Sequence, residues 1–155
     1  MTEDFVGTYD HNLDNKGRVI IPAAFRENLG GGFTVAMNSE WNALALYPAG
    51  KWESIRQKLA RVRDTDPVGM AYKRLVNAYA THVDELDAQG RVVLPKAMRD
   101  KAGLDHKIQF IGMGDYIEIW DDARYTRQEA DNLMRMEELV RHMDERYTPD
   151  FSNTP

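Results

Sequence analysis

The sequence predicts an α+β fold built from two pseudo-symmetric modules, with helices between them and after the second. The first observation is an internal repeat: residues 14–22 return as residues 87–95, so that Asp14 recurs as Asp87, 73 residues later. The same offset relates residues 9–52 to the second copy without a gap. The second observation is that short β-branched stretches alternate with helical patterns in each copy. Two copies are too few for a stacked solenoid, so we expect one two-lobed unit.

The composition is typical of a globular protein. The chain has 155 residues, a formal net charge of −5 and 43% hydrophobic residues, with no cysteine. A copy of under 50 residues is too small to bury a core alone, so the two copies must share one core or complete it with another chain. The sequence has no apolar run long enough for a transmembrane helix and no apolar stretch after its acidic start, which favours the cytoplasm. The absence of cysteine excludes disulfides and weakens the case for zinc.

The charges are unevenly distributed along the chain. Basic residues gather between Lys51 and Arg74, whereas the acidic excess lies between Asp121 and Asp150. A negative total is therefore compatible with a local basic surface.

In the first copy, a turn separates the first two strands. Gly17 can adopt a positive φ, which makes residues 15–17 a turn, and the β-branched residues 18–21 then form the returning strand of a hairpin. Pro22 stops the strand and suits the first turn of a helix. The expected elements are strands at 7–13, 18–21, 33–37 and 43–47, with a helix at 23–29 that ends at the glycines 30–32.

The second copy repeats this order. We expect strands at 83–86, 91–94, 108–111 and 116–120, and a helix that runs from Pro95 to Gly103. The whole chain then divides into a first module at 5–53, a helical connector at 54–80, a second module at 81–127, and a C-terminal helix and tail at 128–155.

Three apolar stripes at helical spacing predict further helices. The stripes are Trp52, Ile55, Leu59 and Val62; Tyr72, Leu75, Val76 and Tyr79; and Leu133, Met136, Val140 and Met143. Asp66-Pro67 is a typical start for the second of these helices, and Thr148-Pro149 interrupts the third. The first and third stripes are candidates for an interface between copies of the chain.

An Asp-x-x-x-Arg motif stands at each turn, as Asp14 with Arg18 and as Asp87 with Arg91. A tight turn brings the two side chains together, so the carboxylate can hold the turn and orient the guanidinium. The arginine can then reach a phosphate or a guanine edge. Lys16 adds a positive charge at the first turn only. A purely structural ion pair that locks a hairpin is the alternative, and the duplication does not separate these two interpretations.

The repeated motifs resemble the MraZ family, bacterial transcriptional regulators built from two copies of the SpoVT-AbrB swapped-hairpin β-barrel module. The resemblance covers most of residues 5–127. The residues that carry it are Gly7-Thr8-Tyr9, Leu13-Asp14-Asn15-Lys16-Gly17-Arg18, Ile21-Pro22-Ala23 with Phe25-Arg26, Leu46-Tyr47-Pro48 with Trp52, Leu86-Asp87-Ala88-Gln89-Gly90-Arg91, and Ile117-Glu118-Ile119-Trp120. The chain departs from the family in the extra residues before Phe5 and in its C-terminal helix and tail, which match only in general character.

The resemblance implies a cytoplasmic, nucleoid-associated DNA-binding protein that assembles as a ring of identical subunits. It implies repression of a cell-division and cell-wall operon through short direct repeats upstream of it. It implies DNA contacts on the two motifs, which correspond here to Asp14 with Arg18 and Asp87 with Arg91. We add Lys16 to these expected DNA-binding residues because of its place at the first turn. No cofactor, metal, catalytic residue, membrane or small-molecule substrate is expected.

The sequence gives weaker support to two other functions. For an enzyme, His82, Asp84, Glu85 and Asp87 are possible metal ligands, but strand alternation places them on opposite faces, and His11 lacks a nucleophilic partner. The glycines 30–32 lack the Lys-Ser/Thr pattern of a phosphate loop. The second alternative is an AbrB/MazE-like antitoxin or protein-interaction module. Antitoxins usually wrap their partner with a disordered tail, whereas the stripe from Leu133 to Met143 predicts a packed helix.

Overall fold

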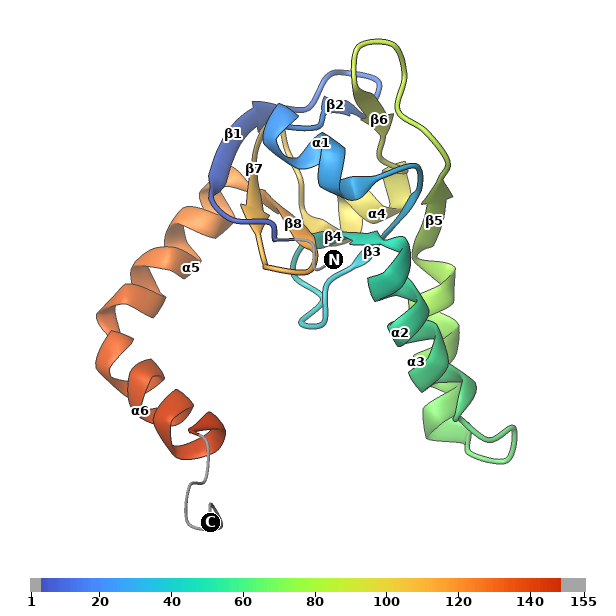
Figure 1. The fold of residues 1–155 in the computed structure, drawn as a ribbon, viewed down its shortest axis with the longest axis vertical. Coiled ribbons are helices and arrows are strands. Elements are labelled where there is room, and N and C mark those ends of the chain that lie inside the picture. The colour runs from blue at the N-terminus through green and yellow to red at the C-terminus, as the bar shows by residue number, and fades with distance from the viewer. Residues whose placement is uncertain (1–3, 149–155) are drawn as a thin grey trace, which may run out of the picture. The chain divides into compact units, whose positions relative to one another are not determined.

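A six-stranded antiparallel sheet and a separate two-stranded ribbon form the β part of the protein (Figure 1). The structure is a computed structural model that describes residues 4–148, and it divides into two compact units at Asp122/Ala123. The elements, in chain order, are β1 (Thr8–Asn12), β2 (Arg18–Ile20), α1 (Ala23–Leu29), β3 (Phe33–Met37), β4 (Leu44–Pro48), α2 (Ala49–Ala60), α3 (Pro67–Ala78), β5 (Ala80–Val83), β6 (Arg91–Val93), α4 (Lys96–Ala102), β7 (Lys107–Gly112), β8 (Ile117–Asp121), α5 (Asp122–Met134) and α6 (Met136–Tyr147). The predicted α+β class is confirmed.

Most predicted elements are found within two residues of their expected bounds. The glycines act as expected: Gly17 has a φ of +77° in the first turn, and Gly103 ends α4 with a φ of +67°. Asp66 caps α3, because its side chain accepts a hydrogen bond of 3.0 Å from the backbone N–H of Gly69.

The predicted hairpin between the first two strands is wrong. β1 does not pair with β2 as a hairpin; β1 pairs with β7, and β2 pairs with β6, so both strands take partners from the other copy. The six-stranded sheet has the order β1-β7-β8-β4-β3-β5. Alternating apolar residues in a strand fix which face is buried but not which strand lies beside it. The cross-copy pairing sets Val19 opposite Val92, and both are buried.

One hydrophobic core serves both copies. The ribbon of β2 and β6 and the helices α1 and α4 cover the six-stranded sheet. The buried residues of this core include, from the first copy, Val19, Ile21, Phe25, Leu29, Val35, Leu44 and Leu46, and, from the second copy, Val92, Leu94, Met98, Ala102, Ile108, Phe110, Ile117 and Ile119. This shared core agrees with the expectation that one copy is too small to bury a core alone.

The strand predicted at 83–86 lies earlier, as β5 at Ala80–Val83. β5 pairs with β3, and the last pair is Phe33 with Val83. Because β3 begins at Phe33, directly after the glycines 30–32, residues 84–86 have no strand beside them. The partner strand, rather than the local sequence, sets this boundary.

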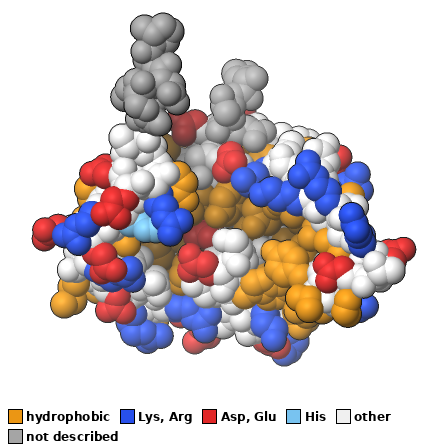
Figure 2. All heavy atoms as spheres, turned by 90° about the horizontal axis from the view of Figure 1, so that it is seen from below, with side chains coloured by type: hydrophobic (Ala, Val, Ile, Leu, Met, Phe, Trp, Pro, Cys, Tyr) orange, Lys and Arg blue, Asp and Glu red, His pale blue; other side chains and the backbone are white. Residues whose placement is uncertain are grey.

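The helices α2 and α3 differ in how much apolar surface they expose. Trp52 and Leu59 of α2 are buried within the chain, so the proposal that this stripe forms an interface is wrong for these two residues, and Val62 lies beyond the end of the helix. On α3, Val68, Tyr72 and Leu75 are exposed. Figure 2 shows orange hydrophobic side chains uncovered on the side of the molecule where α2 and α3 extend.

The second unit is formed by α5 from Ala123 and by α6. The backbone breaks at Arg135, with φ −110° and ψ 25°, so the third apolar stripe spans two helices rather than one. Its members are exposed, as are the neighbouring side chains of Met134 and Tyr147. The helix α6 ends at Tyr147, as expected from Thr148-Pro149, and the predicted tail from Pro149 lies outside the described residues. The division into four segments stays a prediction.

Candidate functional site

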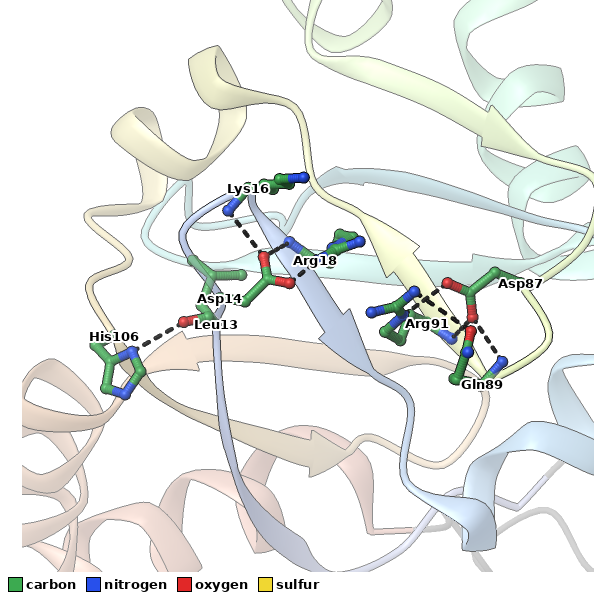
Figure 3. A network of polar contacts seen from close by, with 8 residues as sticks. All are labelled: Leu13, Asp14, Lys16, Arg18, Asp87, Gln89, Arg91 and His106. Atoms are coloured by element: carbon green, nitrogen blue, oxygen red, sulfur yellow. Dashed lines mark hydrogen bonds and ion pairs between the residues drawn. The ribbon is translucent and has the colours of Figure 1, made fainter.

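The first motif forms a closed turn around the carboxylate of Asp14. Its Oδ1 accepts hydrogen bonds from the backbone N–H groups of Lys16, at 2.9 Å, and Arg18, at 2.8 Å. Its Oδ2 accepts from Nε of Arg18 at 2.7 Å (Figure 3). Asp14 thus holds the turn and the guanidinium at the same time, as its spacing from Arg18 predicts.

The second motif repeats this geometry. Oδ1 of Asp87 accepts from the backbone N–H groups of Gln89, at 3.0 Å, and Arg91, at 2.8 Å, and Oδ2 accepts from Nε of Arg91 at 2.7 Å (Figure 3). Both arginine side chains remain about 30% exposed, at 31% for Arg18 and 28% for Arg91. Each guanidinium is therefore oriented by its aspartate and still open to a partner.

The hydrogen bonds change the acidity of both aspartates. They lower the pKa of Asp14 to about 2, first through the backbone N–H of Arg18 and then through its side chain, although partial desolvation opposes the shift. The pKa of Asp87 is lowered for the same reasons, with the backbone N–H of Arg91 as the main cause. Both carboxylates are thus charged at neutral pH and keep their arginines in place.

The tips of the two turns differ in one contact. Oε1 of Gln89 accepts a hydrogen bond of 3.3 Å from Nη2 of Arg91. The first turn has Lys16 at this position, and the side-chain nitrogen of this exposed residue has no hydrogen bond or ion pair within residues 4–148. The first turn thus offers an additional free charge, whereas the second restrains its arginine further.

The ribbon brings the two motifs together. Arg18 lies opposite Val93 and Arg91 lies opposite Ile20, with the buried pair Val19–Val92 between them. Side chains alternate along a strand, so both arginines project from the same face of the ribbon. They also line one surface groove together with residues of β5 and β6.

Two further arginines, which the sequence analysis did not predict as site residues, support the turns across the repeat. Nε of Arg26 donates to the backbone oxygen of Ile21 at 2.8 Å, and Nε of Arg99 donates to that of Leu94 at 2.8 Å. The guanidinium of Arg26 lies against Gly90 of the second turn, and that of Arg99 lies against the first. The sequence held a signal for this pair, because Arg26 and Arg99 match under the 73-residue offset.

The two candidate enzyme histidines, His82 and His11, have structural contacts, and so does a third histidine, His106. Nδ1 of His82 shares a hydrogen bond of 2.7 Å with Oγ1 of Thr34, and the ring of His11 packs edge-on against Phe110. Nδ1 of His106 lies 2.9 Å from the backbone oxygen of Leu13, at the entrance to the first turn (Figure 3). Within the described range, no group of three or more His, Asp or Glu side chains is arranged to hold a metal ion, and no helix is long and apolar enough to cross a membrane.

Comparison with known proteins identifies the family. The family model described as "MraZ protein, putative antitoxin-like" matches residues 5–74 and again residues 78–146, so that its two matches cover the two copies. A "Transcriptional regulator MraZ" of Shewanella amazonensis is 38% identical over 142 residues, which cover 88% of this chain and 93% of that protein. A protein of the same name from Acetivibrio thermocellus is 36% identical over 139 residues, which cover 90% of this chain and 96% of its own length. The chain belongs to the MraZ family.

Proposed function

We propose that this chain is a sequence-specific DNA-binding transcriptional regulator. The relatives that match it over about nine-tenths of its length are named transcriptional regulators. The observation that carries the proposal is the placement of Arg18 and Arg91 on one face of a two-stranded ribbon. A two-stranded ribbon fits the major groove of B-form DNA, where arginine is the commonest reader of guanine.

In this proposal, the aspartate and the arginine of each motif have different roles. Asp14 and Asp87 hold Nε of their arginines, while the remaining nitrogens of Arg18 and Arg91 contact a guanine edge or a phosphate. Lys16 adds a phosphate contact at the first turn. Phosphate contacts position a protein on the duplex, and base contacts give it sequence preference.

We also propose how the chain assembles and which DNA it binds. The family resemblance implies a ring-shaped homo-oligomer that binds short direct repeats and represses the cell-division and cell-wall operon downstream of them. One ribbon makes few phosphate contacts and should bind weakly, whereas several ribbons on successive repeats gain affinity through effective concentration. A cyclic, head-to-tail assembly suits direct repeats better than palindromes. The protein would act in the cytoplasm at the nucleoid, without a cofactor.

We also propose that the two copies form the SpoVT-AbrB swapped-hairpin fold. Support comes from the pairing across the repeat, in which β2 takes β6 as its partner and β1 takes β7. The two turns then lie at the ends of one ribbon, related by a pseudo-twofold axis near Val19 and Val92.

A binding titration tests the DNA proposal. Fluorescence anisotropy would follow the binding of a labelled duplex taken from the region upstream of the protein's own gene. Arg18→Ala and Arg91→Ala should each weaken specific binding by about 1–3 kcal/mol per site. Arg56→Ala is the matched control, because Arg56 is also exposed and paired with a carboxylate, that of Glu53, but lies on α2. Unchanged affinity in both motif variants, with the fold intact by circular dichroism, would refute the assignment.

The antitoxin function is the second candidate, and the description of the matching family model favours it. The exposed apolar stripe on α5 and α6 would then contact a protein partner. Co-purification distinguishes the two: a large homo-oligomer supports the regulator, and a stable complex with a second protein supports the antitoxin.

A further inference from the structure

The outer face of the β2–β6 ribbon carries two apolar side chains, each opposite one of the two arginines. Ile20 is 42% exposed and Val93 is 58% exposed, while their strand neighbours Val19 and Val92 are buried. In the register of the ribbon, Ile20 lies opposite Arg91, and Val93 lies opposite Arg18. Directly opposed side chains in an antiparallel pair are in contact range, so the four form a single patch.

We propose that Ile20 and Val93 determine sequence preference by contacting the C5-methyl groups of thymines in the major groove. This inference rests on the proposed DNA-binding function and assigns it two further specificity-determining residues. Among groove edges, the thymine methyl is the apolar group that a side chain without hydrogen-bonding atoms can recognise. Because the arginines flank both residues, a ribbon that seats its guanidinium groups on the bases also brings the two apolar side chains to the groove floor.

The placement argues against a purely structural role for this pair. The inner face of the ribbon already fills the core through Val19 and Val92, followed by Ile21 and Leu94, which are fully buried. Ile20 and Val93 contribute little to that core because they face outward. The pseudo-twofold axis of the ribbon predicts that they contact two different thymines, one on each side of the centre, each next to a base contacted by an arginine.

In vitro selection tests the inference. A pool of duplex DNA, randomised over a stretch longer than one site, would be selected in parallel with the wild type, Ile20→Ala and Val93→Ala. We expect a wild-type motif that contains guanines and thymines, loss of one thymine preference in Ile20→Ala and of another in Val93→Ala, and retention of the guanines. Val68→Ala is the matched control, because Val68 is an exposed valine on α3, and it should select the wild-type motif.

Methyl-deleted DNA provides the second measurement. Uracil in place of the relevant thymine removes one buried methyl and should weaken wild-type binding about fourfold, but should have no further effect on the matching alanine variant. An unchanged motif in both variants, or a uniform loss of affinity without sensitivity to uracil, would overturn the inference and leave the proposed function standing. A wild type that enriches no sequence would refute the proposed function itself. Thermal melting would establish that each variant is folded.

Discussion

The guanidinium of Arg99 lies directly against the backbone of Gly17, so a side chain of the second copy covers the turn of the first. An ideal Cβ at Gly17 would lie 2.8 Å from Cζ of Arg99, and one at Gly90 would lie 2.6 Å from Cζ of Arg26. Both glycines also have a positive φ, of 77° and 78°. The backbone conformation therefore favours glycine at each turn, and a side chain there would also have to displace the guanidinium of the crossing arginine.

We predict that Gly17→Ala destabilises the protein by about 1–2 kcal/mol from its positive φ, with an added cost for displacing Arg99. Urea unfolding would measure the loss. The added cost should disappear in an Arg99→Ala background, because the collision is then absent. Gly31→Ala is the control, since a Cβ there meets no atom within 4 Å, and it should change stability little. If Gly17→Ala causes the same loss of stability in both backgrounds, Arg99 does not restrict this position.

Lys16→Gln gives the first turn the residue that the second turn has at the corresponding position, Gln89. We predict weaker DNA binding with a shallower salt dependence, by about 1 in the slope of log affinity against log salt per site, because one phosphate contact is lost. The new glutamine should also accept a hydrogen bond from Arg18, as Gln89 does from Arg91. Binding titrations at several salt concentrations would measure the slope.

The reverse change, Gln89→Lys, controls for this effect and should make the salt dependence steeper by a similar amount. A change in base preference with an unaltered slope would instead assign Lys16 to a base.

Local signals in the sequence predicted local structure well, but they did not predict the pairing of strands. The repeat, the turn glycines and Asp66-Pro67 placed the turns and helix ends, because each acts through its own backbone. The choice of β6 as the partner of β2 depends on residues 73 positions away, and the alternation of Val19 and Ile21 is the same for either partner.

The burial of the apolar stripes was equally hard to predict. The first and third predicted stripes have the same spacing, yet Trp52 and Leu59 of the first are buried while Met136 and Val140 of the third are exposed. Spacing identifies an apolar face, but only the packing of the chain decides what covers it. For the site, the sequence indicated Asp14 with Arg18 and Asp87 with Arg91, and their geometry has the predicted Asp–Arg contact; their role in binding DNA stays a proposal.

The low pKa of Asp14 predicts that its ion pair survives mild acid. The pKa is about 2 in the folded protein and 3.8 in an unperturbed aspartate, so the stabilisation is complete above pH 3.8 and is lost as the pH falls towards 2. An NMR titration of the side-chain carboxyl carbon should show the low midpoint. A peptide of residues 12–20 should titrate near the ordinary value.

In Arg18→Ala, the midpoint of Asp14 should rise but stay below the ordinary value, because the backbone N–H groups of residues 16 and 18 still donate. A folded wild type whose Asp14 titrates near 3.8 would show that the turn is open in solution.

The last prediction is a homo-oligomer larger than a dimer that forms without DNA. The helix α6 contains no buried residue, and its apolar stripe of Met136, Val140 and Met143 is about half exposed in the single chain, at 52%, 47% and 54%. A helix of twelve residues depends on packing of its apolar face for stability, so we expect this stripe to be covered by another copy. Light scattering across a dilution series would give the mass.

Val140→Asp should break the assembly into smaller folded species, because it places a charge within the stripe, whereas Arg141→Asp, at the next position and outside the stripe, should leave the mass unchanged. A wild type that stays monomeric at all concentrations would refute the proposed ring. It would also refute the proposal that several weak ribbons act together on direct repeats. If Val140→Asp keeps the wild-type mass, the contact lies elsewhere, and the exposed face of α3 with Val68, Tyr72 and Leu75 becomes the next surface to mutate.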